Sequence, residues 1–121
     1  MDESVFSKSS MLREGFENDA ETGRSGEMRY QLLSKDEFLH AMKWKNTILI
    51  DLRDPESYNR WHLPGAVNRS YDRISEWSLE LDRRQRILLY CSHGNESILA
   101  ARYLGSRGYQ VASLIGGVGR R

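Results

Sequence analysis

The 121-residue chain has one cysteine, three histidines and no long apolar run, and each scarcity excludes a class of protein. Its single cysteine, Cys91, excludes a disulfide within the chain. One cysteine and three histidines in no ligand spacing also argue against a structural zinc site. No segment has the apolar length of a membrane span, and none near Met1 has the pattern of a signal peptide. We therefore expect a cytoplasmic protein that has no membrane partner, no metal and no cofactor.

The chain also carries little net charge, because its 18 Lys and Arg residues nearly balance its 17 Asp and Glu residues and leave a formal charge of +1. Such a balance creates no field that would attract nucleic acid, so we expect no nucleic-acid partner. The length suits one domain with one hydrophobic core. Residues 1–28 are polar and charged, and their scattered apolar residues follow no helix or strand period. We predict that residues 1–28 form a flexible N-terminal arm and that residues 29–121 form the domain.

From Tyr30 onward, apolar runs typical of buried strands alternate with helical patterns. The predicted strands are 30–33, 47–50, 66–68, 87–90 and 111–115. The predicted helices begin at a capping box of Ser34 and Glu37, at Asp54-Pro55, near Ile74 and near Ser97. Ile74, Trp77 and Leu81 are spaced to share one face of the third helix, and Gly108 is predicted to end the last one. This alternation predicts an α/β sandwich around a mainly parallel sheet.

Cys91 stands between the predicted strand 87–90 and a short polar loop that leads into the last helix. This order places the sulfur at the carboxyl end of a parallel strand, which is where ligands bind in such sheets. The start of a helix also presents backbone N–H groups and a positive dipole end, which favour a thiolate over a thiol. Cys91 is therefore a candidate nucleophile, although a lone cysteine is also common as an inert core residue.

The loop after Cys91 is the candidate binding element. Its residues are Ser92, His93, Gly94, Asn95, Glu96 and Ser97. Gly94 lets the chain bend without a Cβ penalty, so that the loop N–H groups can curl around an anion. Ser97 could cap the following helix and offer its hydroxyl to the site. His93 would favour the thiolate in its charged form if it pointed at the sulfur, and would do little if it pointed at solvent.

Three further segments carry a resemblance to a known family. They are Asp51–Tyr58 (DLRDPESY), His62–Asn68 (HLPGAVN) and Gly116-Gly117. In this order and spacing around the Cys91 loop, they make residues 30–121 resemble a single rhodanese-like domain. The resemblance implies a three-layer α/β/α sandwich with a central, mostly parallel sheet. It also implies transfer of sulfane sulfur through a persulfide on Cys91.

The implied reaction takes sulfur from a small donor, thiosulfate or a persulfide, and passes it to an acceptor. The acceptor would be a thiol, a cyanide-like molecule or a sulfur-carrying protein. Cys91 would be the nucleophile, and the loop backbone would stabilise the persulfide anion. Asp51 and Arg53 lie at a strand end, where they would either support the site or form an ion pair between neighbouring loops. His62 would be either a general base or a hydrogen-bonded structural residue.

Three features depart from the family pattern. Glu96 stands where active relatives often carry arginine, which disfavours both an anionic donor such as thiosulfate and the Cys91 thiolate. Trp61 stands where glycine is common, which would reshape the surface at that turn. The chain ends at Arg121, where relatives continue into a closing helix, and we expect that helix to be absent. The exposed apolar surface would then be covered by the N-terminal arm or by a second copy in a homodimer.

Two other functions fit parts of the pattern. Cell-cycle phosphatases of related fold use a similar cysteine loop, but they need arginine at the sixth position after the cysteine, where this chain has Ser97. A catalytically silent binding or regulatory module of the same fold is the main alternative, since Glu96 weakens the case for catalysis while Cys91 supports it. Persulfide formation on Cys91 separates the enzyme from the silent module.

Overall fold

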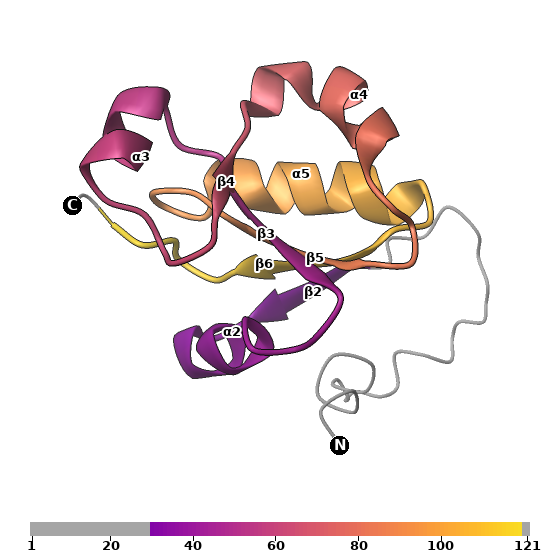
Figure 1. Ribbon diagram of the computed structural model, residues 1–121, viewed down its shortest axis with the longest axis horizontal. Coiled ribbons are helices and arrows are strands. Elements are labelled where there is room, and N and C mark those ends of the chain that lie inside the picture. The colour runs from indigo at the N-terminus through magenta and orange to yellow at the C-terminus, as the bar shows by residue number, and fades with distance from the viewer. Residues whose placement is uncertain (1–29, 120–121) are drawn as a thin grey trace.

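A five-stranded sheet forms the centre of the fold (Figure 1). The computed structural model describes residues 30–119, so the predicted arm, residues 1–28, lies outside the described chain. Across the sheet the strands are β2 (Tyr30–Leu33), β6 (Gln110–Leu114), β5 (Arg86–Tyr90), β3 (Thr47–Asp51) and β4 (Val67–Asn68). Every pair of neighbouring strands is parallel, which confirms the predicted parallel sheet.

Helices cover both faces of this sheet. They are α2 (Lys35–Ala41), α3 (Pro55–Arg60), α4 (Ile74–Trp77) and α5 (Asn95–Ser106). Figure 1 shows α4 and α5 over one face and α2 on the opposite face, which confirms the predicted three-layer α/β/α sandwich. None of the helices within residues 30–119 has the length and apolarity needed to span a bilayer.

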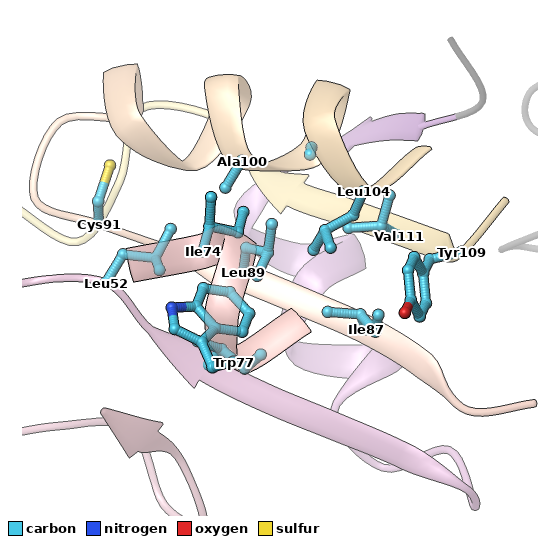
Figure 2. Close-up of a cluster of buried hydrophobic side chains, with 12 residues drawn as sticks. Leu52, Ile74, Trp77, Ile87, Leu89, Cys91, Ala100, Leu104, Tyr109 and Val111 are labelled. Carbon is cyan, nitrogen blue, oxygen red and sulfur yellow. The ribbon is translucent and has the colours of Figure 1, made fainter. Parts of the chain in front are cut away.

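Two clusters of buried side chains hold the layers together. The α5-face cluster (Figure 2) contains Ile50, Leu52, Ile74, Trp77, Ile87, Leu89, Cys91, Ala100, Ala101, Leu104, Tyr109 and Val111. The α2-face cluster contains Leu33, Phe38, Ala41, Trp44, Leu49, Ala66, Leu88, Tyr90, Ala112 and Leu114. Consecutive residues of the central strands alternate between the two clusters, so these strands are buried on both faces. Burial on both faces explains why their sequences are continuous apolar runs.

Local sequence sets most of the helix ends. Ser34 Oγ accepts the Glu37 N–H at 3.2 Å, and the Glu37 carboxylate accepts the Ser34 N–H at 2.9 Å, which is the predicted capping box. Asp54 caps α3 by accepting a first-turn N–H at 3.3 Å, and Pro55 follows at the first helical position. Gly108, with a φ of +91°, lies just beyond α5 and ends it as predicted.

The predicted third helix is wrong in its C-terminal half. α4 ends at Trp77, residues 78–80 form a 3₁₀ turn, and Leu81 is extended. The Tyr109 hydroxyl donates to the Ser78 carbonyl at 2.8 Å, and the Leu81 N–H closes a three-residue turn on the same carbonyl at 3.2 Å. Apolar spacing alone does not reveal a carbonyl that is bound by a distant side chain.

Candidate active site

The sulfur of Cys91 lies at the carboxyl end of β5, in the middle of the sheet. The residue is 5% exposed. Figure 2 shows its side chain at one end of the α5-face cluster, beside Leu52, with the sulfur directed away from Leu52. Two backbone N–H groups donate to the sulfur, that of Gly94 at 3.1 Å and that of Ser97 at 3.4 Å. Such donors stabilise a sulfur anion, so the geometry suits a thiolate nucleophile.

Ser97 does not cap α5, and that prediction is wrong. The helix begins at Asn95, after Gly94, which has a φ of +93° and no side chain to act as a cap. Ser97 is therefore the third residue of the helix. Its N–H, which an N-cap side chain normally accepts, donates to the Cys91 sulfur instead. The candidate nucleophile itself caps the helix, which places the sulfur at the positive end of the α5 dipole.

The backbone around Cys91 is held by the segments on either side of it. The Tyr90 carbonyl accepts an N–H from the residue after β3 at 2.9 Å, and the Cys91 carbonyl accepts the Val118 N–H at 3.0 Å. The Ser92 carbonyl accepts the Gly119 N–H at 2.7 Å. Because three consecutive carbonyls are bonded to neighbouring segments, the N–H groups that follow can turn toward the sulfur.

Gly117 is where the segment after β6 packs against the Cys91 loop. Its φ is +72°, and a Cβ atom at this position would lie 2.3 Å from the Ser92 carbonyl oxygen and 2.6 Å from that of Cys91. Both separations are far inside van der Waals contact, so the position accepts only glycine. Gly116 also has a positive φ, +78°, but a Cβ atom there would meet nothing within 4 Å.

The outer residues of the loop face solvent. His93, Asn95 and Glu96 are exposed, and Ser92 is half-buried. Of the two alternatives for His93, the structure therefore shows the solvent-exposed one. Glu96 lies in the first turn of α5, where its carboxylate is near the same positive helix end that the sulfur uses.

Two buried hydroxyl groups form a short chain that begins at the sulfur. Ser97 Oγ is 3.5 Å from Cys91 Sγ and 3.5 Å from the Gly94 carbonyl oxygen. The Ser113 hydroxyl on β6 donates to Ser97 Oγ at 2.7 Å, and both serines are fully buried. Sequence reasoning misses Ser113, whose one signal is a hydroxyl inside the otherwise apolar stretch 111–115.

A buried ion pair lies at the end of the neighbouring strand. Arg53 reaches back to Asp51, with Nε at 3.1 Å from one carboxylate oxygen and Nη2 at 2.8 Å from the other. This hydrogen bonding to Asp51 raises the pKa of Arg53. Asp51 is fully buried and Arg53 is 5% exposed. Of the two alternatives drawn from the sequence, the structure therefore shows the ion pair.

Tyr90, the residue before the cysteine, joins this ion pair to the loop after α3. Its hydroxyl donates to the Asp51 carboxylate at 2.7 Å and accepts the Leu63 N–H at 3.0 Å. Burial, together with the hydrogen bond to Asp51, raises the pKa of Tyr90. Arg53 also donates to the Trp61 carbonyl and lies over the Trp61 ring, 5.5 Å from its centroid. Sequence reasoning misses Tyr90 because an aromatic residue at the end of an apolar strand is expected only to pack in the core.

His62 is a structural residue of the same loop. Its Nδ1 atom lies 2.8 Å from the Tyr58 carbonyl oxygen, and its ring stacks on that of Tyr58 with centroids 3.8 Å apart. The Tyr58 hydroxyl in turn donates to the Ala66 carbonyl at 2.6 Å. These contacts match the hydrogen-bonded alternative for His62.

A depression of about 300 Å³ lies between β4 and α4, and none of the residues that line it belongs to the Cys91 loop. It is lined by Asn68, Arg69, Ser70, Arg73, Glu76, Trp77 and Glu80. Within residues 30–119, no three His, Cys, Asp or Glu side chains are grouped closely enough to hold a metal ion. The groups gathered at the sulfur are backbone N–H donors and hydroxyls.

The family model of the rhodanese-like domain matches residues 34–119, which include the whole Cys91 loop. The chain therefore belongs to the rhodanese-like domain family. It is 34% identical over 91 residues to the thiosulfate sulfurtransferase GlpE of Coxiella burnetii, with 74% of this chain and 85% of that protein covered. These matches identify a member of a sulfurtransferase family.

Solved structures show the same fold. A rhodanese-related protein from Thermoplasma volcanium has a TM-score of 0.67 at 21% identity, over 74% of this chain and 87% of that one. A rhodanese homolog from the bacterium Thermus thermophilus has a TM-score of 0.60 at 27% identity, over 73% of this chain and 96% of that one.

Gly117→Ala is expected to destabilise the protein and displace the Cys91 loop, because the added methyl group meets two carbonyl oxygens. The matched control, Gly116→Ala, shares the positive φ but has open space, so it carries only a conformational penalty of about 1–2 kcal/mol. In urea unfolding, Gly117→Ala should lose at least ~2 kcal/mol more than the control. Equal losses would contradict the close packing at Gly117.

Tyr90→Phe is expected to lower the free energy of unfolding at pH 7 by about 1–3 kcal/mol, since the Asp51 carboxylate loses a donor and the Leu63 N–H loses its acceptor. Because the pKa of Tyr90 is raised on folding, the unfolded chain releases this proton first. The stabilisation that the folded protein gains by holding the Tyr90 proton is complete below about pH 10 and is lost as the pH rises above it.

The difference in unfolding free energy between the wild type and Tyr90→Phe should therefore shrink above about pH 10. Urea unfolding at several pH values measures it. Tyr103→Phe, a half-buried tyrosine outside this network, is the control and should leave the pH dependence unchanged. A constant difference across this range would show that Tyr90 does not hold its proton as described.

Proposed function

We propose that the protein is a sulfurtransferase that carries sulfane sulfur on Cys91 as a persulfide. The observation that carries the proposal is the pair of N–H donors, from Gly94 and Ser97, that point at the sulfur from the start of α5. They supply positive potential to an anionic sulfur through backbone groups that neither gain nor lose a proton during the reaction. Family membership and the sulfurtransferase relatives support the same reaction.

In the first half-reaction, the Cys91 thiolate attacks the outer sulfur of the donor. A new S–S bond forms, the donor's own bond to that sulfur breaks, and the donor leaves with the bonding electron pair. Thiosulfate leaves as sulfite. The negative charge of the resulting persulfide lies one bond farther out than that of the thiolate. The N–H groups of Asn95 and Glu96, in the first turn of α5, have no acceptor within the helix and are suited to that charge.

In the second half-reaction, a thiolate or cyanide attacks the outer sulfur and removes it. The S–S bond breaks and Cys91 regains its electron pair as a thiolate. The Gly94 and Ser97 donors then stabilise this leaving group. The protein alternates between two covalent forms, which is a ping-pong mechanism.

The proposed donor is thiosulfate or a persulfide, and the acceptor is a thiol, a cyanide-like molecule or a sulfur-carrying protein. The name of the GlpE relative favours thiosulfate. Glu96 disfavours it, because a carboxylate in the first turn of α5 repels an anionic donor and opposes the helix dipole. Glu96 is exposed, so solvent screens its charge, and we expect weaker thiosulfate use rather than none.

A phosphatase reaction has less support from the same loop. The bidentate guanidinium that would hold a phosphate is replaced by the Ser97 hydroxyl, which lies 3.5 Å from the sulfur and is fully buried. The catalytically silent binding module is the alternative that the first experiment must distinguish from the sulfurtransferase.

The reduced protein is expected to gain one sulfur atom when it is exposed to thiosulfate, a mercaptoacid donor or a persulfide. Intact-mass measurement detects the gain, which should be absent in Cys91→Ser and reversed by cyanide or a thiol. Circular dichroism and thermal unfolding establish that the variant is folded. If folded wild-type protein takes no sulfur from any donor, the enzyme proposal fails and the binding module replaces it.

Glu96→Arg is expected to raise kcat/KM for thiosulfate roughly threefold, and Glu96→Gln to raise it less, because the charge beside the donor becomes more positive. Glu56→Arg is the control for net charge, since Glu56 is also an exposed glutamate in the first turn of a helix, α3. It should leave kcat/KM unchanged. No increase in Glu96→Arg would contradict the electrostatic role of Glu96 while leaving the Cys91 mechanism untouched.

A further inference from the structure

Ser113 is a fully buried polar residue among apolar neighbours. It lies in β6, whose other buried members are Val111, Ala112 and Leu114. Serine packs less well in a strand than a β-branched residue, and a buried hydroxyl is tolerated only when it is hydrogen-bonded. The Ser113 hydroxyl donates to Ser97 Oγ at 2.7 Å, in the first turn of α5.

Ser97 Oγ has one proton and three neighbours. Because Ser113 donates to it, the proton of Ser97 is directed to one of the other two, Cys91 Sγ or the Gly94 carbonyl oxygen, each at 3.5 Å. That distance is at the outer limit for a bond between a hydroxyl and a carbonyl oxygen, so Gly94 holds the proton weakly. A sulfur anion is the stronger acceptor, because hydrogen bonds to charged groups exceed those between neutral groups.

The Ser113–Ser97–Cys91 chain therefore has two arrangements. With a thiol, the sulfur donates to Ser97 Oγ, and Ser97 donates to the Gly94 carbonyl. With an anionic sulfur, the Ser97 hydroxyl turns and donates to the sulfur, while Ser113 continues to donate to Ser97. Donation by Ser113 polarises Ser97 and makes it a better donor.

We infer that Ser113 is a positioning residue for the sulfur chemistry, which directs the Ser97 proton to the Cys91 sulfur when that sulfur is negatively charged. The effect of this role on turnover rests on the proposed function. The hydrogen-bond chain itself exists whichever sulfur compound reacts, so it is testable without a sulfur donor.

The experiment is the pH profile of iodoacetamide alkylation, which reports the thiolate of Cys91 alone because the chain has one cysteine. It is run on the wild type, Ser97→Ala, Ser113→Ala and the double variant, after thermal unfolding shows that each is folded. Each single variant should move the midpoint upward by about half a pH unit. The double variant should match Ser97→Ala, because Ser113 acts only through Ser97.

Ser78→Ala is the matched control, since Ser78 is a buried serine in another element, and it should keep the wild-type midpoint. Ser113→Val, which lacks the hydroxyl but suits a strand, repeats the test if the alanine variant does not fold. An unshifted midpoint in Ser113→Ala, or a further shift on adding it to Ser97→Ala, overturns the inference.

The two proposals fail in different ways. If the variants alkylate as expected but the wild type forms no persulfide, the proposed role of Ser113 stands and the sulfurtransferase proposal fails. If the wild type forms the persulfide but Ser113→Ala alkylates with the wild-type profile, the proposed role of Ser113 fails and the sulfurtransferase proposal stands.

Discussion

The buried carboxylate of Asp51 is the constraint on which the rest of the structure depends. A charge removed from water is tolerated only when hydrogen bonds surround it, and removal of one partner typically costs about 3–5 kcal/mol. The side chain of Arg53 and the hydroxyl of Tyr90 both bind this carboxylate. The Asp51 carbonyl also accepts from Asn68 Nδ2 and from the Arg69 N–H, each at 3.0 Å. One residue thus joins the carboxyl ends of β3, β4 and β5.

This anchor determines where the cysteine lies and what surrounds it. Tyr90 is bonded to Asp51 and directly precedes Cys91, so the residue that ends β5 cannot shift without disturbing a buried charge. The guanidinium of Arg53 is engaged by the same carboxylate and by a backbone carbonyl. Its charge therefore belongs to the scaffold, and the positive potential at the sulfur comes from backbone N–H groups at the start of α5.

The architecture follows from local sequence, whereas much of the site does not. Apolar runs, two side-chain caps and Gly108 predict the strands, most helix ends and the parallel sheet, because each signal acts over a few neighbouring residues. The end of α4 and the roles of Tyr90 and Ser113 depend on bonds to residues that are 31, 39 and 16 positions away. A single sequence does not reveal which of its distant residues are in contact. The capping role given to Ser97 failed because α5 begins two residues earlier, at Asn95. The cap comes from a sulfur six residues before Ser97, which accepts the Ser97 N–H.

The capping of α5 by the Cys91 sulfur has a consequence for observing any reaction at this cysteine. The N–H groups of Gly94 and Ser97 touch the sulfur, so a gain of sulfur, a loss of charge or an oxidation at Cys91 changes the environment of both amides. Amide chemical shifts are sensitive to such changes, and these two signals therefore act as built-in reporters of the state of the cysteine. Backbone nuclear magnetic resonance can follow a reaction at the sulfur without any label on the reacting group.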